Sequence, residues 1–330
     1  MSTLKVDAIR HNSATSDAIT TAADGTCTGK ITNYPRRNLF LNGALNISQR
    51  GDSYASANAY TADQWYVFVT GVTAQRLTTS PPDGFTYYIR FPSATSSPIM
   101  SQQIELDAQG KVGKYKNKTV TVSWYARSES NNKMYVDAAF KNASGGGDYT
   151  SIVAGSGSPQ DITSSWARYS QTFTISATPH ANNTCFSVMI RTPSSGSGST
   201  GTLEATGFQC EFGDTVTDFE HIAIADDLSR CQRYYQKIDY YCQTGNSGHR
   251  HMYGENIPFK CEMRAAPSLV GNSNYNSDSG SLQTITAGDY STYTDGCSLQ
   301  HASTSQVTVQ GGSGSQYHRI RGRVHLSAEI

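Results

Sequence analysis

Short runs of alternating apolar and polar residues dominate the chain from residue 37 to about residue 222. Val120, Val122 and Trp124 alternate with hydroxyl residues, and residues 186–190 repeat the pattern. A period of two places successive side chains on opposite faces of a strand, so each run predicts a strand with one buried face. Because no helical pattern separates these runs, they predict a β-sandwich of two sheets.

Two further runs, residues 66–69 and 87–91, are mainly apolar and are typical of central strands. Clusters of Gly, Pro, Ser, Asp and Thr separate the strands at residues 80–84, 143–148 and 193–201. These residue types favour turns and exposed loops.

The stretch from Leu203 to Tyr235 joins two different tracts of the chain. Its beginning predicts a strand with a β-bulge at Gly207, and residues 213–220 predict a polar turn. Asp226 and Asp227 then suit the first turn of a helix, where the helix dipole favours negative charge. Side chains at spacings of four, three, four and three predict one face of that helix: Ile224, Leu228, Cys231, Tyr235 and Ile238.

A tyrosine-rich tract follows the helix. We expect strands around residues 251–253, 259–263, 282–286, 306–309 and 317–326. Tyrosine combines a large apolar face with a hydroxyl group, which suits interfaces and sugar recognition. The tyrosines of this tract are Tyr234, Tyr235, Tyr240, Tyr241, Tyr253, Tyr275, Tyr290, Tyr293 and Tyr317.

Residues 1–36 form a different kind of segment. Leu4, Val6 and Ala8 are spaced as in a strand, and a hydroxyl-rich stretch and a turn at residues 24–26 follow. A segment of this size cannot bury a core by itself, so it either needs a partner surface or forms a disordered tail. The two interpretations are compatible if attachment orders the segment.

Composition narrows the classes of partner. Lys plus Arg and Asp plus Glu both number 26 among 330 residues, which argues against nucleic-acid binding and against adhesion to anionic lipid. With neither a signal sequence nor an apolar run long enough to span a bilayer, we expect synthesis in a cytoplasm and no membrane insertion. The seven cysteines lack paired close spacings and predict reduced, mostly buried thiols.

Candidate chemical sites are weak. His249 and His251 lie near Cys242 and Cys261, but the spacing matches no familiar zinc motif, and we interpret them as ordinary histidines. Calcium beside Asn42-Gly43 stays an open alternative without a visible acidic cluster. The sequence has neither a phosphate loop of the G-x-x-x-x-G-K type nor a G-x-S-x-G motif. We therefore expect no enzyme activity and no cofactor.

The densest acidic group does not predict a glycoside hydrolase. Closely spaced acids on one strand and its turn rarely face each other across a bond, so we expect solvated turn residues. The group consists of Glu204, Glu211, Asp214, Asp218 and Glu220. Among the aromatic candidates for sugar binding, Trp65 and Trp124 fit core positions and Trp166 stays open. The sequence therefore assigns no catalytic, cofactor-binding, metal or ligand-binding residue.

Several motifs carry a resemblance in chain order. They are RNLFLNGALNISQRG from Arg37, YTADQWYV from Tyr60, the acidic turn and DxLxRCQRYY helix after residue 203, PFKCEMRAAPSL from Pro258, and the final RVHLSAEI. Together they resemble tail-fibre-like and receptor-binding-like virion proteins of tailed phages of the marine type. Residues 37–222 also look like a carbohydrate-binding jelly roll of the galactose-binding-like type, in which the opening Asn-Gly turn lies beside the closing strand.

The resemblance implies an all-β protein with three parts. These are an attachment segment at residues 1–36, a jelly-roll β-sandwich at 37–222, and a short helix with a C-terminal β domain at 223–330. It further implies a homotrimer in the virion tail that binds other tail proteins and host surface polysaccharide. Two alternatives stay open: a purely structural tail adaptor or head decoration protein, and a polysaccharide depolymerase.

Overall fold

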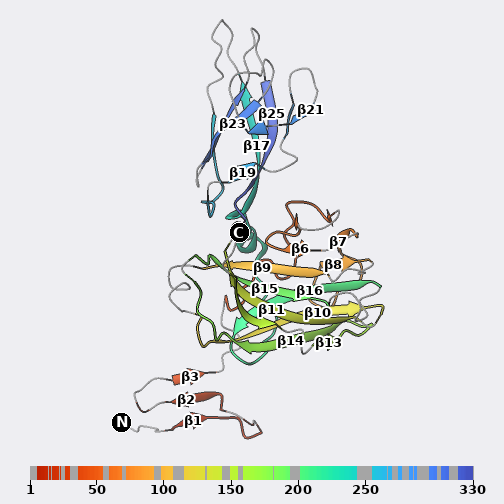
Figure 1. Ribbon diagram of the computed structural model, residues 1–330, viewed down its shortest axis with the longest axis vertical. Helices are drawn as coiled ribbons and strands as arrows, with labels where there is room; N and C mark the ends of the chain where they lie inside the picture. The colour runs from red at the N-terminus through yellow and green to blue at the C-terminus, as the bar shows by residue number, and fades with distance from the viewer. Residues whose placement is uncertain are drawn as a thin grey trace, which may run out of the picture.

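The computed structural model shows an all-β protein, in which the described residues form one short helix (Figure 1). The structure describes residues 6–29 (without 14, 16, 22 and 24–26), 36–54, 59–68, 72–92, 98–106, 115–193 (without 131, 143–148, 155–158 and 181), 201–243 and 255–329 (without 266, 270–273, 277–281, 285, 288–296, 303–305 and 312–318).

A jelly-roll β-sandwich forms the middle of the molecule. One sheet has the strand order β14-β10-β16-β8-β7-β4: Ala167–Thr174, Thr119–Ser128, Leu203–Phe212, Tyr88–Phe91, Ala74–Leu77 and Ser53–Tyr54. The other has the order β12-β11-β15-β9-β6-β5: Tyr149–Ala154, Lys133–Lys141, Cys185–Arg191, Ile99–Glu105, Tyr66–Phe68 and Ala59–Tyr60, with β13 (Gln160–Asp161) beside β11. The pairs in both sheets are antiparallel, and the predicted fold class is confirmed.

The core lies between the two sheets and follows the alternation read from the sequence. Val120, Val122 and Trp124 of β10 are fully buried with Phe186 and Val188 of β15. Trp65 is also fully buried, and its ring packs 4.6 Å from that of Phe208 and 5.1 Å from that of Phe40, centroid to centroid. The prediction that Trp65 and Trp124 are packing residues is confirmed.

The predicted bulge at Gly207 is present. The register between β10 and β16 shifts between Ser123 and Tyr125, where Gly207 has φ +62°. A Cβ atom there would lie 2.6 Å from Phe85 Cζ and 2.8 Å from Tyr125 Cδ2. Glycine is therefore required for both the left-handed backbone and the close approach of two rings.

The opening segment of the sandwich lies beside its closing strand, as the resemblance implied. Leu39 N donates to Cys210 O at 2.7 Å, and Phe208 N donates to Gly43 O at 2.9 Å. The side-chain amide of Asn38 accepts from Cys210 N and donates to Phe208 O. Residues 38–43 therefore extend the hydrogen bonding of β16 across to the second sheet.

The helix is shorter than predicted. α1 spans Ile224–Gln232 with Asp226 and Asp227 in its first turn, and β17 begins at Tyr235. The assignment of Tyr235 and Ile238 to the helix is wrong, because both lie on a strand paired with β25 (Arg319–Ser327). Ile224 is 63% exposed, whereas Asp227 and Cys231 are buried. The buried face therefore includes Cys231 from the predicted apolar face, and also Asp227, whose Oδ1 accepts from Asn42 N at 3.0 Å.

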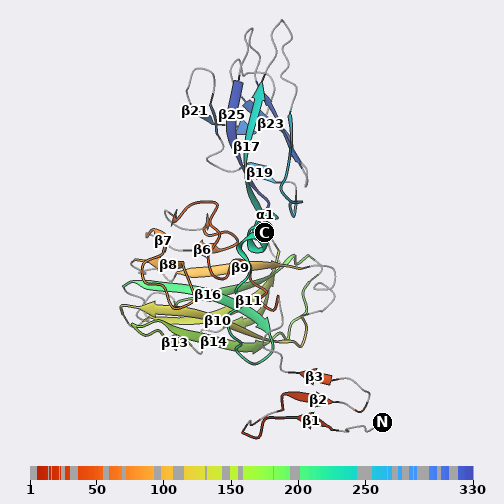
Figure 2. The same cartoon turned by 180° about the vertical axis from the view of Figure 1, so that it is seen from behind.

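Two small sheets follow the helix at one end of the molecule, and Figure 2 shows them from behind. One has the order β17-β25-β20-β21 with β19 beside β25, and the other the order β18-β24-β23-β22. The first sheet consists of β17 (Tyr235–Gln243), β25 (Arg319–Ser327), β20 (Asn274–Asn276), β21 (Leu282–Thr284) and β19 (Ser268–Leu269). The second consists of β18 (Glu255–Pro258), β24 (Gln306–Gly311), β23 (Cys297–Ala302) and β22 (Thr286–Ala287). The prediction of a strand at residues 259–263 is wrong, because β18 ends at Pro258 and residues 259–263 belong to no strand. The strand predicted at 251–253 lies outside the described residues.

A polar junction ties these sheets to the sandwich. Arg50 Nη2 lies 2.6 Å from Glu329 Oε1, and Gln64 Nε2 donates to Glu329 Oε2 at 3.0 Å. The Arg50 guanidinium also lies 3.6 Å from the ring centroid of Tyr235. Asp63 is buried 3.7 Å from Arg50, so one guanidinium faces two carboxylates.

The N-terminal segment forms a three-stranded antiparallel sheet at the opposite end (Figures 1 and 2). Its strands are β1 (Ala8–Ile9), β2 (Ile19–Thr21) and β3 (Cys27–Gly29). Val6, Ile9 and Ile19 are 41%, 52% and 38% exposed. The segment thus has strand structure, while the domain boundaries at 36/37 and 222/223 stay predictions.

Candidate functional site

The candidate site lies along β9, at the point where pairing between β9 and β6 ends. β6 pairs with β9 only through Ile99, Met100 and Ser101, so residues 102–105 of β9 have no neighbouring strand on that side within the described part of the chain. We call these four residues the open edge. On its other side the open edge pairs with β15 as far as Glu105.

Some backbone groups of the open edge point away from β15, toward the side of β9 where β6 no longer pairs. Leu106 N donates to Thr184 O, and Thr192 N donates to Pro98 O, which places the even-numbered residues of β9 in the hydrogen-bonded pairs with β15. In an antiparallel ladder alternate residues point their N–H and C=O groups to opposite sides. The backbone groups of Gln103 and Glu105 therefore point away from β15.

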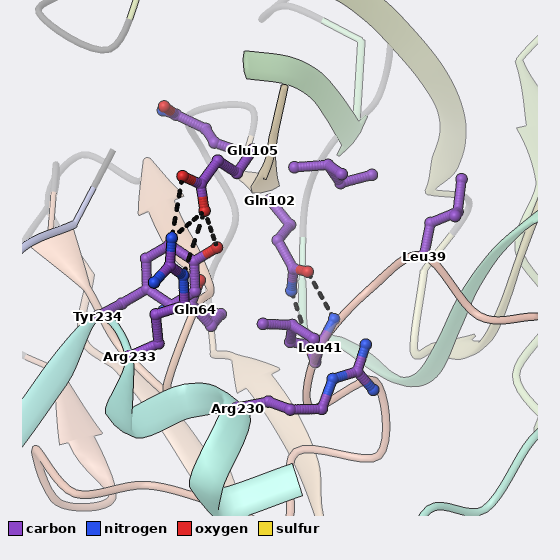
Figure 3. A pocket seen from close by; sticks show the side chains of 10 residues that line it. Leu39, Leu41, Gln64, Gln102, Glu105, Arg230, Arg233 and Tyr234 are labelled. Carbon is purple, nitrogen blue, oxygen red and sulfur yellow. Dashed lines mark hydrogen bonds and ion pairs between the residues drawn. The ribbon is translucent and has the colours of Figure 1, made fainter. Parts of the chain in front are cut away.

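A pocket of about 250 Å³ occupies this place (Figure 3). Four separate parts of the chain line it: the opening segment, the residue before Trp65, the open edge, and the end of α1 with the turn after it. The lining residues are Leu39, Leu41, Gln64, Gln102, Gln103, Ile104, Glu105, Arg230, Arg233 and Tyr234.

Gln102 holds the opening segment against the open edge. Its side-chain Oε1 accepts from Leu41 N at 2.6 Å, and its Nε2 donates to Leu41 O at 2.8 Å. One side-chain amide thus reproduces the paired bonds that a neighbouring strand would have made. This arrangement leaves the Leu41 side chain in the pocket beside Gln102, as Figure 3 shows.

Glu105, Arg233 and Tyr234 form a cluster at one side of the pocket. Arg233 Nη2 lies 3.2 Å from both carboxylate oxygens of Glu105, and Tyr234 Oη donates to Glu105 Oε2 at 3.2 Å. Burial raises the pKa of Tyr234, and the adjacent Glu105 raises it further, so the phenol stays protonated and donates. Burial works against the charge of Arg233, but the Glu105 carboxylate raises the pKa of the guanidinium overall.

Arg230 lies at the other side and differs from Arg233. Among the residues that the structure describes, its guanidinium makes no hydrogen bond or ion pair, although it is partly buried in the pocket wall. Asp227, three residues earlier, uses its carboxylate to accept from Asn42 N. The pocket therefore combines an apolar wall, three amide side chains, one matched ion pair and one unmatched guanidinium.

The sequence assigned no residue to this site. Of the aromatic residues singled out there, Tyr234 lines the pocket, while Trp65 and Trp124 lie in the core. Trp166 is half-buried, and its Nε1 donates to Ser80 O at 3.0 Å. The spacing of Arg230 and Arg233, one helical turn apart, could have indicated a cationic site. No pattern in the sequence marks Gln64 or Gln103 as pocket residues.

The prediction that the acidic group consists of solvated turn residues is wrong for two of its members. Glu204 and Glu211 are 3% and 2% exposed, on the face of β16 that points away from the core. Glu204 pairs with Arg90 at 2.6 Å and also with Arg127, and Glu211 accepts from Thr217 and Gln209. Asp214 and Asp218 are exposed as expected. Glu220 is half-buried and accepts from Asn38 N at 2.8 Å.

The structure offers no support for either ion site considered above. His249, His251 and the side chain of Cys242 lie outside the described residues, within which no three His, Cys, Asp or Glu side chains gather as a metal cluster. The Asn42 amide is occupied, because Nδ2 donates to Ile47 O and Asp63 O while Oδ1 accepts from Ile47 N. Cys185, Cys210 and Cys231 are buried free thiols, as predicted.

None of the helices in the described part of the chain is both apolar enough and long enough to cross a bilayer. No model of a known protein family matches the chain, and no curated protein matches it by sequence.

Solved structures similar to the sandwich include carbohydrate-binding modules. The CBM22-1 xylan-binding domain of Paenibacillus barcinonensis Xyn10C is 11% identical with a TM-score of 0.34, over 54% of this chain and 96% of that one. A CBM4 module is 19% identical with a TM-score of 0.32, over 52% and 98%. The enzymatically active domain of tailspike protein 4 of bacteriophage CBA120 is 13% identical with a TM-score of 0.34, over 55% of this chain and 22% of that one. Similarity at this level carries no argument about a ligand.

Proposed function

We propose that this protein is a glycan-binding adhesin whose binding site is the pocket at the open edge. The observation that carries the proposal is the combination of strand-edge backbone groups without a neighbouring strand in the described residues and an apolar wall. Gln103 and Glu105 supply backbone donors and acceptors, while Leu41 and Ile104 supply apolar surface. A sugar ring needs this pairing, because its rim carries hydroxyl groups and its faces are apolar.

The volume of the pocket sets the size of the ligand. At about 250 Å³ it lies below the roughly 300–1,000 Å³ that encloses drug-sized molecules. We infer that one sugar unit enters the pocket and that the rest of the glycan lies outside it. Weak single sites of this kind give firm attachment when several copies of the protein act together.

We propose binding without catalysis. Glycoside hydrolysis in most families uses two carboxyl groups on either side of the scissile bond. Among the described residues that line the pocket, only Glu105 carries a carboxylate, and Arg233 and Tyr234 hold it. Incubation with host polysaccharide tests this, since a steady release of reducing ends would contradict it.

The motifs in the sequence support a more specific role as a tail fibre or receptor-binding protein of a tailed phage. In this proposal residues 1–36 attach the protein to other tail proteins, the assembly is a homotrimer, and host surface polysaccharide is the receptor. Sedimentation of the purified chain tests the trimer, and a stable monomer at micromolar concentration would contradict it.

A structural role without glycan binding is the second candidate, and the N-terminal sheet favours it. Val6, Ile9 and Ile19 expose apolar surface on a sheet without a described core of its own. Such a sheet suits packing against another protein of the particle.

Binding of the labelled protein to candidate host cells separates the two roles. We expect saturable binding that soluble host polysaccharide abolishes. The variant Gln103→Trp should fill the pocket and remove binding, whereas Asp214→Ala, at an exposed turn residue, should leave it unchanged. If the Gln103→Trp variant folds and binds like the wild type, the pocket is not the site.

A further inference from the structure

The pocket has an excess of one positive charge. Glu105 is matched by Arg233, and Tyr234 donates a further hydrogen bond to the same carboxylate. Arg230 has no such partner in the part of the chain that the structure describes, and Arg side chains stay protonated in proteins. The lining of the pocket thus carries two guanidinium groups and one carboxylate.

We propose that Arg230 binds the acid group of an acidic sugar, so that the ligand class of this pocket is a glycan with a uronic-acid-like unit. The inference rests on the proposed glycan-binding function and makes it more specific. A guanidinium offers two parallel N–H donors that match the two oxygens of a carboxylate. Neutral sugars cannot use this group as fully, because a hydroxyl oxygen accepts without a negative charge.

The positions of the groups fit a single ring between two polar ends. Figure 3 shows the Glu105 cluster at one side of the pocket and the Arg230 guanidinium at the other, with Leu41 and Gln102 between them. A ring that packs on Leu41 places its acid group toward Arg230. Its hydroxyl groups then face the open edge, where Gln103 and Glu105 present backbone groups.

Other charges near Arg230 do not replace the ligand. Asp227 is buried, accepts from Asn42 N and interacts with Arg230 electrostatically, without a hydrogen bond or ion pair between them. Asp226 is exposed and makes no described ion pair with Arg230. Arg50 and Glu329 are engaged with each other at the junction behind Gln64. Arg230 is therefore the cation of this pocket that makes no hydrogen bond or ion pair within the described residues.

Matched monosaccharides test the proposal on the full chain. The probes are the methyl glycosides of glucuronic, galacturonic and mannuronic acid, each paired with the corresponding neutral hexose, in titrations followed by ligand-observed NMR. We expect at least one acid to bind about tenfold more tightly than its neutral partner, as a charge-assisted hydrogen bond contributes. Raising the salt concentration should weaken binding of the acid more than binding of the neutral sugar.

Variants of one residue separate charge from geometry. Arg230→Gln should lower the affinity for the acid about tenfold and leave the neutral sugar unchanged, whereas Arg230→Lys should retain part of the preference. Arg10→Gln, directly after β1, removes the same charge far from the pocket and should change neither affinity. Thermal unfolding confirms that each variant is folded.

The outcomes distinguish this inference from the function on which it rests. Equal binding of acidic and neutral sugars, or an unchanged preference in Arg230→Gln, overturns the acidic-sugar inference and leaves the glycan-binding proposal standing. A wild-type protein that binds neither these sugars nor host polysaccharide overturns both.

Discussion

Two places on the sandwich bring charged side chains against a strand, and they differ in how those charges are matched. On the outer face of β16, which we call the covered face, Glu204 and Glu211 are nearly inaccessible and each has several partners. Along the open edge of β9, Glu105 is 34% exposed at its side chain, and Arg230 makes no hydrogen bond or ion pair within the described residues. Fully matched charges stabilise the fold, whereas an incomplete set leaves hydrogen-bonding capacity for a ligand.

The opening segment connects the two places, so breaking it should have the largest effect. A Cβ atom on Gly43 would lie 2.1 Å from Phe208 O, a backbone atom of β16. We expect Gly43→Ala to lower the free energy of unfolding by more than about 3 kcal/mol, because the segment must move off the strand. Urea unfolding measures this.

Gly51→Ala serves as the control for Gly43→Ala. Gly51 has φ +102° but nothing within 4 Å of an added Cβ, so only backbone strain of about 1 kcal/mol is expected. Equal losses in the two variants would show that the contact with Phe208 is not decisive.

On the covered face, removal of one carboxylate should lower the free energy of unfolding nearly as much as Gly43→Ala. Glu204→Ala leaves Arg90 and Arg127 without their shared partner, and their side chains are 36% and 27% exposed. Because water reaches both guanidinium groups, we expect a loss of about 2–3 kcal/mol, toward the lower end for a broken buried pair. The exposed Asp214→Ala should change the free energy of unfolding by less than about 0.5 kcal/mol. A neutral Glu204→Ala would mean that the covered face does not depend on its ion pairs.

The junction between sandwich and C-terminal sheets is an intermediate case, since Arg50 there faces two carboxylates. Burial raises the pKa of Glu329 from its ordinary value of 4.5 to about 7, although Arg50 opposes the shift. A carboxyl group whose pKa is raised by folding stabilises the folded state below its unfolded pKa, and this contribution disappears as the pH rises through the folded value. Stability from this group should therefore fall between pH 4.5 and pH 7, by on the order of 2 kcal/mol.

Glu329→Gln isolates that contribution, because glutamine does not titrate. The difference in unfolding free energy between wild type and variant, measured at half-unit steps from pH 4.5 to 7.5, should change in this direction. Asp63 is buried as well, which also raises its pKa, and its charge raises the pKa of Glu329. The difference therefore reports the titration of this coupled pair of carboxyl groups. A difference that does not vary with pH would contradict the raised pKa.

At the open edge, the effect on stability should be smallest. Glu105 and Arg233 form a partly exposed ion pair, with side chains 34% and 41% accessible, so Glu105→Gln should cost less than about 1 kcal/mol. The same change leaves Arg233 unmatched beside Arg230. If the pocket takes acidic sugars, their affinity should rise about threefold while the stability stays nearly constant. A loss of acidic and neutral sugar binding together would instead show that Glu105 accepts hydroxyl groups of the ligand.

The sequence alone determined the strands of the sandwich and several of their details. The alternation of Val120, Val122 and Trp124 predicted a buried face, because a strand has no freedom to place successive side chains on one side. Gly207 predicted the bulge, and the resemblance to a galactose-binding-like jelly roll implied that Asn42-Gly43 lies beside the closing strand. These features depend on the geometry of a few neighbouring residues or on short motifs, and both can be identified from the sequence.

Only the tertiary structure decided the helix boundary and the pocket. Tyr235 and Ile238 keep a helical spacing, yet pairing with β25 places them on a strand. Glu204 and Glu211 are buried because arginine and threonine partners from distant positions reach them. The pocket exists because β6 stops at Ser101, which leaves residues from four parts of the chain around an unpaired edge. Where a strand ends relative to its neighbour depends on the register of the whole sheet, and no local pattern encodes it.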